Sequence, residues 1–232
     1  MIPRPAALAA AGAALALHNV NVERLPGWLY VPANLATAGA VLATARAAGI
    51  RPHDLGLSPA GLVPGLLVGA PVAAAVVALG CHPGTRPLFA DRRLAGVTAA
   101  GVAYRAAVRI PLGTVVLEEV AFRGVLPALA GAVPASLAFG AWHVVPTAAA
   151  LDVNRVTGRR RLAVLAGTVA ATTAVGLGLC RLRRATGGLL APAIVHAAAT
   201  STAVLVAGLR PARSSPMPAA PAGRPRRAAR RR

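Results

Sequence analysis

The chain is poor in charged and aromatic residues. Only 13% of its 232 residues are charged and 3% are aromatic, whereas 56% are hydrophobic. A soluble domain carries about 25% charged residues, so water cannot be the solvent for most of this surface. The apolar residues are mostly alanine, valine, leucine and glycine, which let helix backbones approach closely in a bilayer. The composition excludes an ordinary soluble domain and predicts an all-α, polytopic membrane helix bundle.

Cysteine is scarce and lysine is absent. Cys81 and Cys180 cannot form a disulfide framework, and neither lies in a Cys-x-x-Cys pair, so we assign them no chemistry. All 25 basic residues are arginines. Together with the high alanine content, this indicates a GC-rich coding sequence and predicts a bacterial cell membrane as the location.

The formal net charge of +19 is typical of nucleic-acid-binding proteins, but its distribution argues against that function. Eight arginines lie in residues 210–232, a stretch rich in proline and arginine and free of acidic residues. This composition predicts a disordered tail whose arginines can contact anionic lipid head groups. We therefore expect membrane lipids as partners and no nucleic acid.

Apolar segments bounded by turn residues or arginine clusters recur along residues 1–209 and predict one domain of about seven to eight transmembrane helices. The first segment also resembles a secretory signal peptide, but it lacks a small-x-small cleavage pattern, so we expect a retained first helix. Arginines follow several successive segments, so the charge pattern does not assign an orientation. The predicted segments are 5–20, 28–48, 61–80, 93–108, 111–131, 133–150, 161–181 and 187–209.

Two of the six acidic residues, Glu118 and Glu119, are adjacent inside an apolar segment. A charge at membrane depth costs about 2.5–3.5 kcal/mol or more, so such residues are functional by default. On a helix, Glu119 and Arg123 share a face, whereas Glu118 points about 100° away. Arg123 can then neutralise Glu119 and leave Glu118 as a candidate general base. The alternative is an arginine–glutamate clamp with a purely structural role.

Two of the five histidines, His143 and His196, are also predicted to lie within apolar helices. Phe139 precedes His143 by four residues, and Thr200 follows His196 by four, so each pair shares one helix face. An acid pair and two imidazoles in a bilayer interior are costly unless they share a polar cavity. We therefore expect Glu118 and both histidines to meet.

These residues, in this order, resemble the pattern of the CPBP family of intramembrane peptidases, which is related to the CAAX-processing and bacteriocin-processing proteases. The resemblance covers about residues 110–205 and includes the Phe-Arg-Gly that follows the glutamate pair. It implies an endopeptidase that hydrolyses a peptide bond of a membrane-anchored peptide or protein. The matching residues are Glu118-Glu119-x-x-x-Arg123, Phe139-x-x-x-His143 and His196-x-x-x-Thr200.

The resemblance also implies a role for each residue. Glu118 would activate the attacking water, supported by Glu119 and Arg123, and His143 would assist at the reaction centre. His196 and the residue four positions later would stabilise the oxyanion. That residue is usually asparagine or aspartate in the family. In this chain it is a threonine, Thr200, which can donate one hydrogen bond.

Other mechanisms and functions are compatible with the same residues. In one, Glu118, His143 and His196 ligate a Zn²⁺ ion that activates water. The chain has no His-Glu-x-x-His motif, so the metal-free form is favoured and zinc is the alternative. A non-catalytic membrane scaffold or immunity-type protein with a degenerate site is the second hypothesis, supported by the threonine at position 200. A coupled transporter is disfavoured because no repeat halves are visible.

Overall fold

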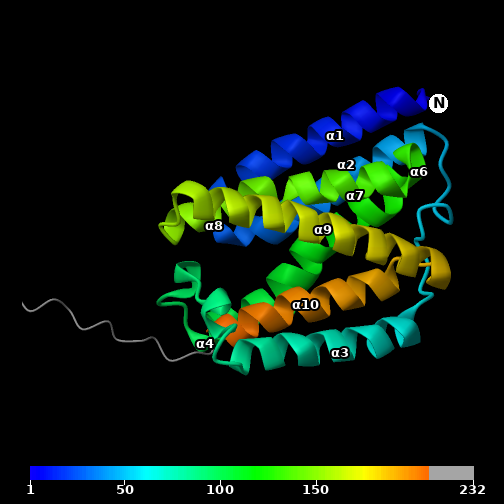
Figure 1. Cartoon of the computed structure of the whole chain (residues 1–232). Helices are drawn as coiled ribbons and strands as arrows, with labels where there is room; N and C mark the ends of the chain where they lie inside the picture. Colours follow the sequence, from blue (N-terminus) through cyan, green and yellow to red (C-terminus); the bar gives the residue numbers. More distant parts are fainter. Residues whose placement is uncertain (209–232) are drawn as a thin grey trace, which may run out of the picture.

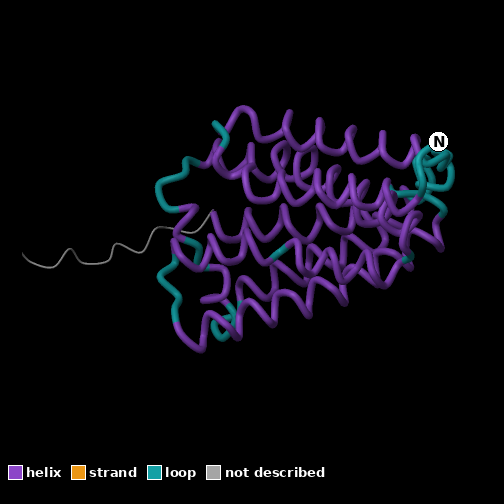
Figure 2. The backbone as a smooth tube through the Cα atoms, turned by 90° about the horizontal axis from the view of Figure 1, so that it is seen from above, coloured by secondary structure: helices purple, strands orange, loops and turns teal. Residues whose placement is uncertain are grey.

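The computed structural model describes residues 1–208, and all the regular secondary structure in that range is helical, with no strand. The helices lie roughly side by side in a bundle (Figure 1), and the loops gather at its two ends (Figure 2). The prediction of an all-α fold is confirmed. The predicted tail, residues 210–232, lies outside the described residues.

The first part of the bundle consists of three separate helices and the second part of a long central helix followed by four more. The central helix contains two π-helical segments, η5 and η6, which separate its α-helical parts. The helices are α1 (Arg4–Asn21), α2 (Tyr30–Ala47), α3 (Leu62–Cys81), then α4 (Ala99–Tyr104), η5 (Arg105–Val115), α5 (Val116–Glu119), η6 (Val120–Val125) and α6 (Leu126–Ala130) without interruption, and finally α7 (Ala132–Trp142), α8 (Val144–Val153), α9 (Gly158–Thr186) and α10 (Leu190–Gly208).

The central helix corrects one predicted boundary. The segments 93–108 and 111–131 were expected to be two helices, but the chain runs as one helix from Ala99 to Ala130. Thr98 caps its first turn by accepting a hydrogen bond from the Gly101 amide. The helix continues through Pro111, which lacks an N–H donor, inside η5. The wider π-helical bonding accommodates the proline there.

Four helices within residues 1–208 are long and apolar enough to cross a membrane: Arg4–Arg24, Leu62–Cys81, Gly158–Thr186 and Leu190–Gly208. The predicted count of seven to eight spans is not confirmed. On the outer faces of α3 and α9, large apolar side chains such as Leu67 and Leu162 are exposed, at 71% and 67%. Apolar surface of this extent is suited to lipid. The chain is an integral membrane protein.

Glycines bring α3 and α10 close together, and these two helices lie side by side in Figure 1. A Cβ atom added at Gly65 would lie 2.9 Å from the Cα atom of Ala191, and one at Gly69 would lie 3.2 Å from Ile194. Because the two glycines are four residues apart, they form a strip on one face of α3. The strip allows the backbone of α10 to approach, as small residues do in membrane bundles.

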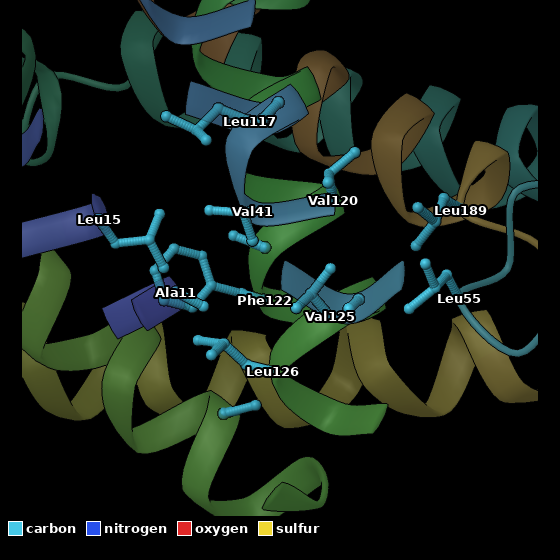
Figure 3. Packing of buried hydrophobic residues seen from close by; sticks show 14 of the residues in the cluster. Ala11, Leu15, Val41, Leu55, Leu117, Val120, Phe122, Val125, Leu126 and Leu189 are labelled. Atoms are coloured by element: carbon cyan, nitrogen blue, oxygen red, sulfur yellow. The ribbon is translucent and has the colours of Figure 1, made fainter. Parts of the chain in front are cut away.

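The central helix forms the middle of the core. Residues 117–126 are all buried. Leu117, Val120 and Phe122 pack there against α2 and α1, which contribute Val41 and Leu15 to the same cluster (Figure 3). The two glutamates therefore lie in the most enclosed stretch of the chain.

Candidate active site

Four ionisable side chains are buried together at the centre of the bundle. Glu118, Glu119 and Arg123 lie on the central helix and His196 on α10, and each residue is less than 9% exposed. Breaking a buried ion pair leaves an uncompensated charge, so such groups persist only when they compensate one another. The predicted placement of Glu118 in the interior is confirmed.

His196 bridges the two glutamates. Its Nδ1 atom lies 2.8 Å from Oε1 of Glu119, within hydrogen-bond distance. Its Nε2 atom faces Oε2 of Glu118 at 3.7 Å. Because an ionised carboxylate only accepts, Nδ1–H is the donor to Glu119. The expected meeting of Glu118 and His196 is confirmed.

Arg123 forms the ion pair that the helical spacing predicts. Its Nε atom lies 3.5 Å from Oε2 of Glu119, and both side chains are almost completely buried. The guanidinium also stacks over the Phe139 ring, with its carbon 3.9 Å from the ring centroid. Glu119 thus has a cation on one side and an imidazole N–H on the other, whereas Glu118 has no basic side chain other than His196 within ion-pair distance among the described residues.

His143 lies at a different place from the one predicted. It was expected inside a single helix over 133–150, but α7 ends at Trp142 and His143 is the half-buried turn residue before α8. Its Nδ1–H donates to the Phe139 carbonyl, 2.8 Å away. Its ring packs edge-on against Phe139, whose ring also contacts His196. Within residues 1–208, no hydrogen bond or ion pair joins His143 to Glu118 or His196.

The zinc site that the sequence left as an alternative is not assembled in this structure. The described residues contain no group of three His, Cys, Asp or Glu side chains that could hold a metal ion. The imidazole of His143 is hydrogen-bonded to the Phe139 carbonyl of α7, whereas Glu118 and His196 face each other. The donor set of Glu118, His143 and His196 therefore does not fit zinc as it stands.

Thr200 is engaged within its own helix. Its hydroxyl donates to the carbonyl of His196, one turn earlier, at 2.8 Å. A threonine hydroxyl has one proton to donate, so in this arrangement that proton is not available to a ligand. The oxyanion role implied for Thr200 stays a prediction.

Sequence reasoning missed Trp142 and His18. The indole Nε1–H of Trp142 donates to Oε1 of Glu118 at 2.9 Å. His18 lies half-buried in α1 with its ring parallel to the indole. The available signal was the rarity of aromatics, because the chain has only two tryptophans and one of them directly precedes His143.

A cavity of about 470 Å³ lies beside Glu119. Glu119 is the only charged residue in a lining that is otherwise apolar apart from Ser58. The volume is within the usual range of ligand pockets, about 300–1,000 Å³. The lining comes from the loop residues Gly56, Leu57, Ser58 and Pro59, from Val116, Glu119 and Val120 of the central helix, and from Leu189, Leu190 and Ala193.

The loop that borders this cavity is fixed to the bundle by its backbone. The amide of Leu189 donates to the Gly56 carbonyl at 2.9 Å. A Cβ atom at Gly124 would lie 3.2 Å from the Leu55 carbonyl oxygen, so glycine allows this loop to lie close to the central helix. The glycine of the Phe-Arg-Gly sequence therefore has a packing role at the site.

The bundle and its buried residues define a class: an integral membrane protein with a glutamate–histidine site enclosed by helices. Residues 100–202 match the family model of the Rce1-like type II CAAX prenyl endopeptidases. The resemblance predicted from the sequence is thereby confirmed. The matched range includes all six predicted site residues. No curated protein and no solved structure matches the chain.

Proposed function

We propose that the protein is an intramembrane endopeptidase that hydrolyses a peptide bond of a membrane-anchored peptide or protein in a bacterial cell membrane. The observation that carries this proposal is the position of His196 between the carboxylates of Glu118 and Glu119, inside an Rce1-like domain. Hydrolysis needs a base for water and a donor for the developing oxyanion, and this arrangement supplies a candidate for each.

Glu118 is the proposed general base. Its Oε1 atom accepts from Trp142, whereas its buried Oε2 atom has no hydrogen-bond partner among the described residues. Oε2 takes a proton from water as the water oxygen forms a bond to the scissile carbonyl carbon. When the tetrahedral intermediate collapses, the C–N bond breaks and the proton passes from Glu118 to the departing nitrogen. The products are a carboxyl group and an amine.

His196 is the proposed oxyanion donor. With both ring nitrogens protonated, the imidazole donates Nδ1–H to Glu119, which orients the ring so that Nε2–H lies on the side of Glu118 where the carbonyl would bind. A donor fixed in this way stabilises the charge that develops in the transition state without reorganisation. Arg123 compensates the charge of Glu119. His143 keeps the assisting role that the family pattern implies. Thr200 can take its implied role only if its hydroxyl leaves the His196 carbonyl, so in the observed arrangement His196 alone supports the oxyanion.

The cavity beside Glu119 is the proposed substrate site. Its mostly apolar lining suits apolar side chains of a peptide held at the membrane. Because Glu119 contacts both the cavity and His196, a peptide in the cavity would lie next to the proposed oxyanion donor.

The experiment is a cleavage assay with membrane-anchored peptides, read by mass spectrometry. Wild type should cleave at least one peptide, and Glu118→Gln should cleave none while keeping the helical circular-dichroism spectrum. The matched control is Glu23→Gln, which changes a carboxylate that pairs with Arg109 and is 59% exposed. Cleavage by Glu118→Gln within a few-fold of wild type would remove Glu118 from the mechanism.

We propose the metal-free form of this mechanism, because Glu118, His143 and His196 are not assembled as ligands. Treatment with a chelator should leave the cleavage rate unchanged. If the chelator abolishes cleavage and added zinc restores it, the metal-dependent form is correct.

A second candidate function is a non-catalytic membrane scaffold or immunity-type protein with a degenerate site. The hydrogen bond from Thr200 to the His196 carbonyl favours it. The family pattern has an amide or carboxyl side chain at this position, whereas here the side chain is a hydroxyl that is bound to the helix backbone. In that case wild type would cleave no member of a broad peptide library, and Glu118→Gln would change thermal stability alone.

A further inference from the structure

Trp142 holds one of the two oxygens of the proposed base. It is the last residue of α7, and its indole Nε1–H lies 2.9 Å from Oε1 of Glu118. An indole is a donor only and does not ionise in the range where side chains titrate. It can therefore hold a carboxylate oxygen without exchanging a proton with it.

Other contacts hold the backbone and the ring of Trp142 in place. The side-chain amide of Asn19 donates to the backbone carbonyl of Trp142 at 2.9 Å. The Phe122 ring meets the indole edge-on, with centroids 5.5 Å apart. The His18 ring lies parallel to it within 4°, with centroids 6.3 Å apart.

His18 is itself fixed by two side chains of α2. Its Nε2 atom donates to Oδ1 of Asn34 at 3.2 Å, and its Nδ1 atom is hydrogen-bonded to the Thr37 hydroxyl at 2.9 Å. A row of contacts therefore runs from α2 through His18 and Trp142 to Glu118. His18 and Asn19 belong to α1, which lies outside the family-matched residues 100–202.

We propose that Trp142 is a positioning residue for Glu118, and that the end of α1 supports it through His18 and Asn19. This inference rests on the proposed function. By holding Oε1, the indole leaves Oε2 as the oxygen that faces His196 and the attacking water. A hydrogen bond to a charged acceptor is among the stronger ones, and the buried carboxylate has no other donor within hydrogen-bond distance among the described residues.

The contact can be tested without turnover. The chain has two tryptophans, and Trp28 is 73% exposed, so Trp28→Phe leaves one indole N–H to observe by ¹H–¹⁵N NMR in detergent. Adding Glu118→Gln should move this resonance strongly, because a neutral amide oxygen is a weaker acceptor than a carboxylate. The control is Glu23→Gln, which should not move it. An indole resonance that does not respond to Glu118→Gln overturns the inference.

The positioning role is tested by kinetics. Trp142→Phe keeps an aromatic ring but removes the N–H, so kcat should fall by about 10- to 100-fold, the value of one hydrogen bond to a charged group. The KM should stay within a few-fold, because the indole does not line the cavity. Trp28→Phe is the matched control and should keep both constants.

The outcomes separate this inference from the proposed function. Unchanged kcat in a folded Trp142→Phe protein overturns the positioning role and leaves the peptidase proposal in place. A wild-type protein that cleaves no peptide overturns the peptidase proposal and with it the catalytic role of Trp142. If Trp142→Phe does not fold, the response of the indole resonance to Glu118→Gln decides whether the contact exists.

Discussion

The Nδ1 atom of His196 lies 2.8 Å from Oε1 of Glu119, so residues 77 positions apart share one buried hydrogen bond. The bond joins α10 to the central helix, and its length depends on how closely these helices pack. Glycines of α3 set the position of α10 on its opposite side. The geometry of the proposed oxyanion donor is thus coupled to the packing of the whole bundle.

Removing Arg123 should destabilise the fold as well as the site. Arg123→Ala leaves the Glu119 carboxylate buried without its cation, and breaking a buried pair typically costs about 3–5 kcal/mol. Thermal unfolding in detergent, followed by circular dichroism, should show a large loss of stability.

The control for Arg123 is a surface pair. Arg161 bonds to Asp152, whose side chain is 69% exposed, so Arg161→Ala should change stability little. Equal melting temperatures for the Arg123 and Arg161 variants would show that the buried pair does not stabilise the fold.

The approach of α10 to α3 should be sensitive to one methyl group. In Gly65→Ala the added Cβ would lie 2.9 Å from both the Cα of Ala191 and the Cδ1 of Ile194, so the helices must separate. We expect a loss of about 1–3 kcal/mol, as for other overpacked sites, together with a lower cleavage rate, because α10 carries His196.

Gly12→Ala is the matched control for this packing. A Cβ at Gly12 meets nothing within 4 Å, so alanine there should keep or slightly raise stability through its higher helix propensity. A Gly65→Ala protein as stable and as active as Gly12→Ala would show that the helix contact does not govern the site.

The sequence was sufficient for those parts of the site that follow from helical spacing or from the cost of buried charge. Glu119 and Arg123 lie one turn apart on any helix. The free-energy cost of isolated ionisable groups in a bilayer interior predicted that Glu118 and His196 lie together. The sequence could not place Trp142, because its contact with Glu118 depends on how α7 approaches the central helix.

The errors of the sequence reasoning also have local causes. A helix end was expected near Pro111, but π-helical bonding carries the central helix through it. Phe139 and His143 do lie on one face, as their spacing predicts, because their rings pack edge-on. The predicted single helix over 133–150 is wrong, because α7 ends at Trp142 and His143 is a turn residue whose imidazole donates to the Phe139 carbonyl.

Asp91 should contribute a pH-dependent stability outside the spans. Burial acts to raise the pKa of this carboxyl, but hydrogen bonds from Arg93 and Asn154 outweigh it and hold the pKa below its usual range. The stabilisation is therefore present above the unfolded-state pKa of about 3.9 and is lost as pH falls through the lower folded-state value. The difference in melting temperature between wild type and Asp91→Asn should be constant near neutral pH and shrink below about pH 4. A difference that does not change with pH would contradict this assignment.

Position 200 tests how far this site departs from the family pattern. Because the Thr200 hydroxyl donates to the His196 carbonyl, Thr200→Val, which keeps the shape and removes the donor, should change the cleavage rate by less than about threefold, far below the 10²–10³ lost with a working oxyanion donor. Thr200→Asn restores a side chain with two N–H donors and should raise the rate if His196 alone now supports the oxyanion. Steady-state cleavage of one peptide by the three proteins decides the matter. A large loss in Thr200→Val would show that the hydroxyl turns from the helix to the substrate during the reaction, and equal rates in all three would show that residue 200 does not contact the transition state.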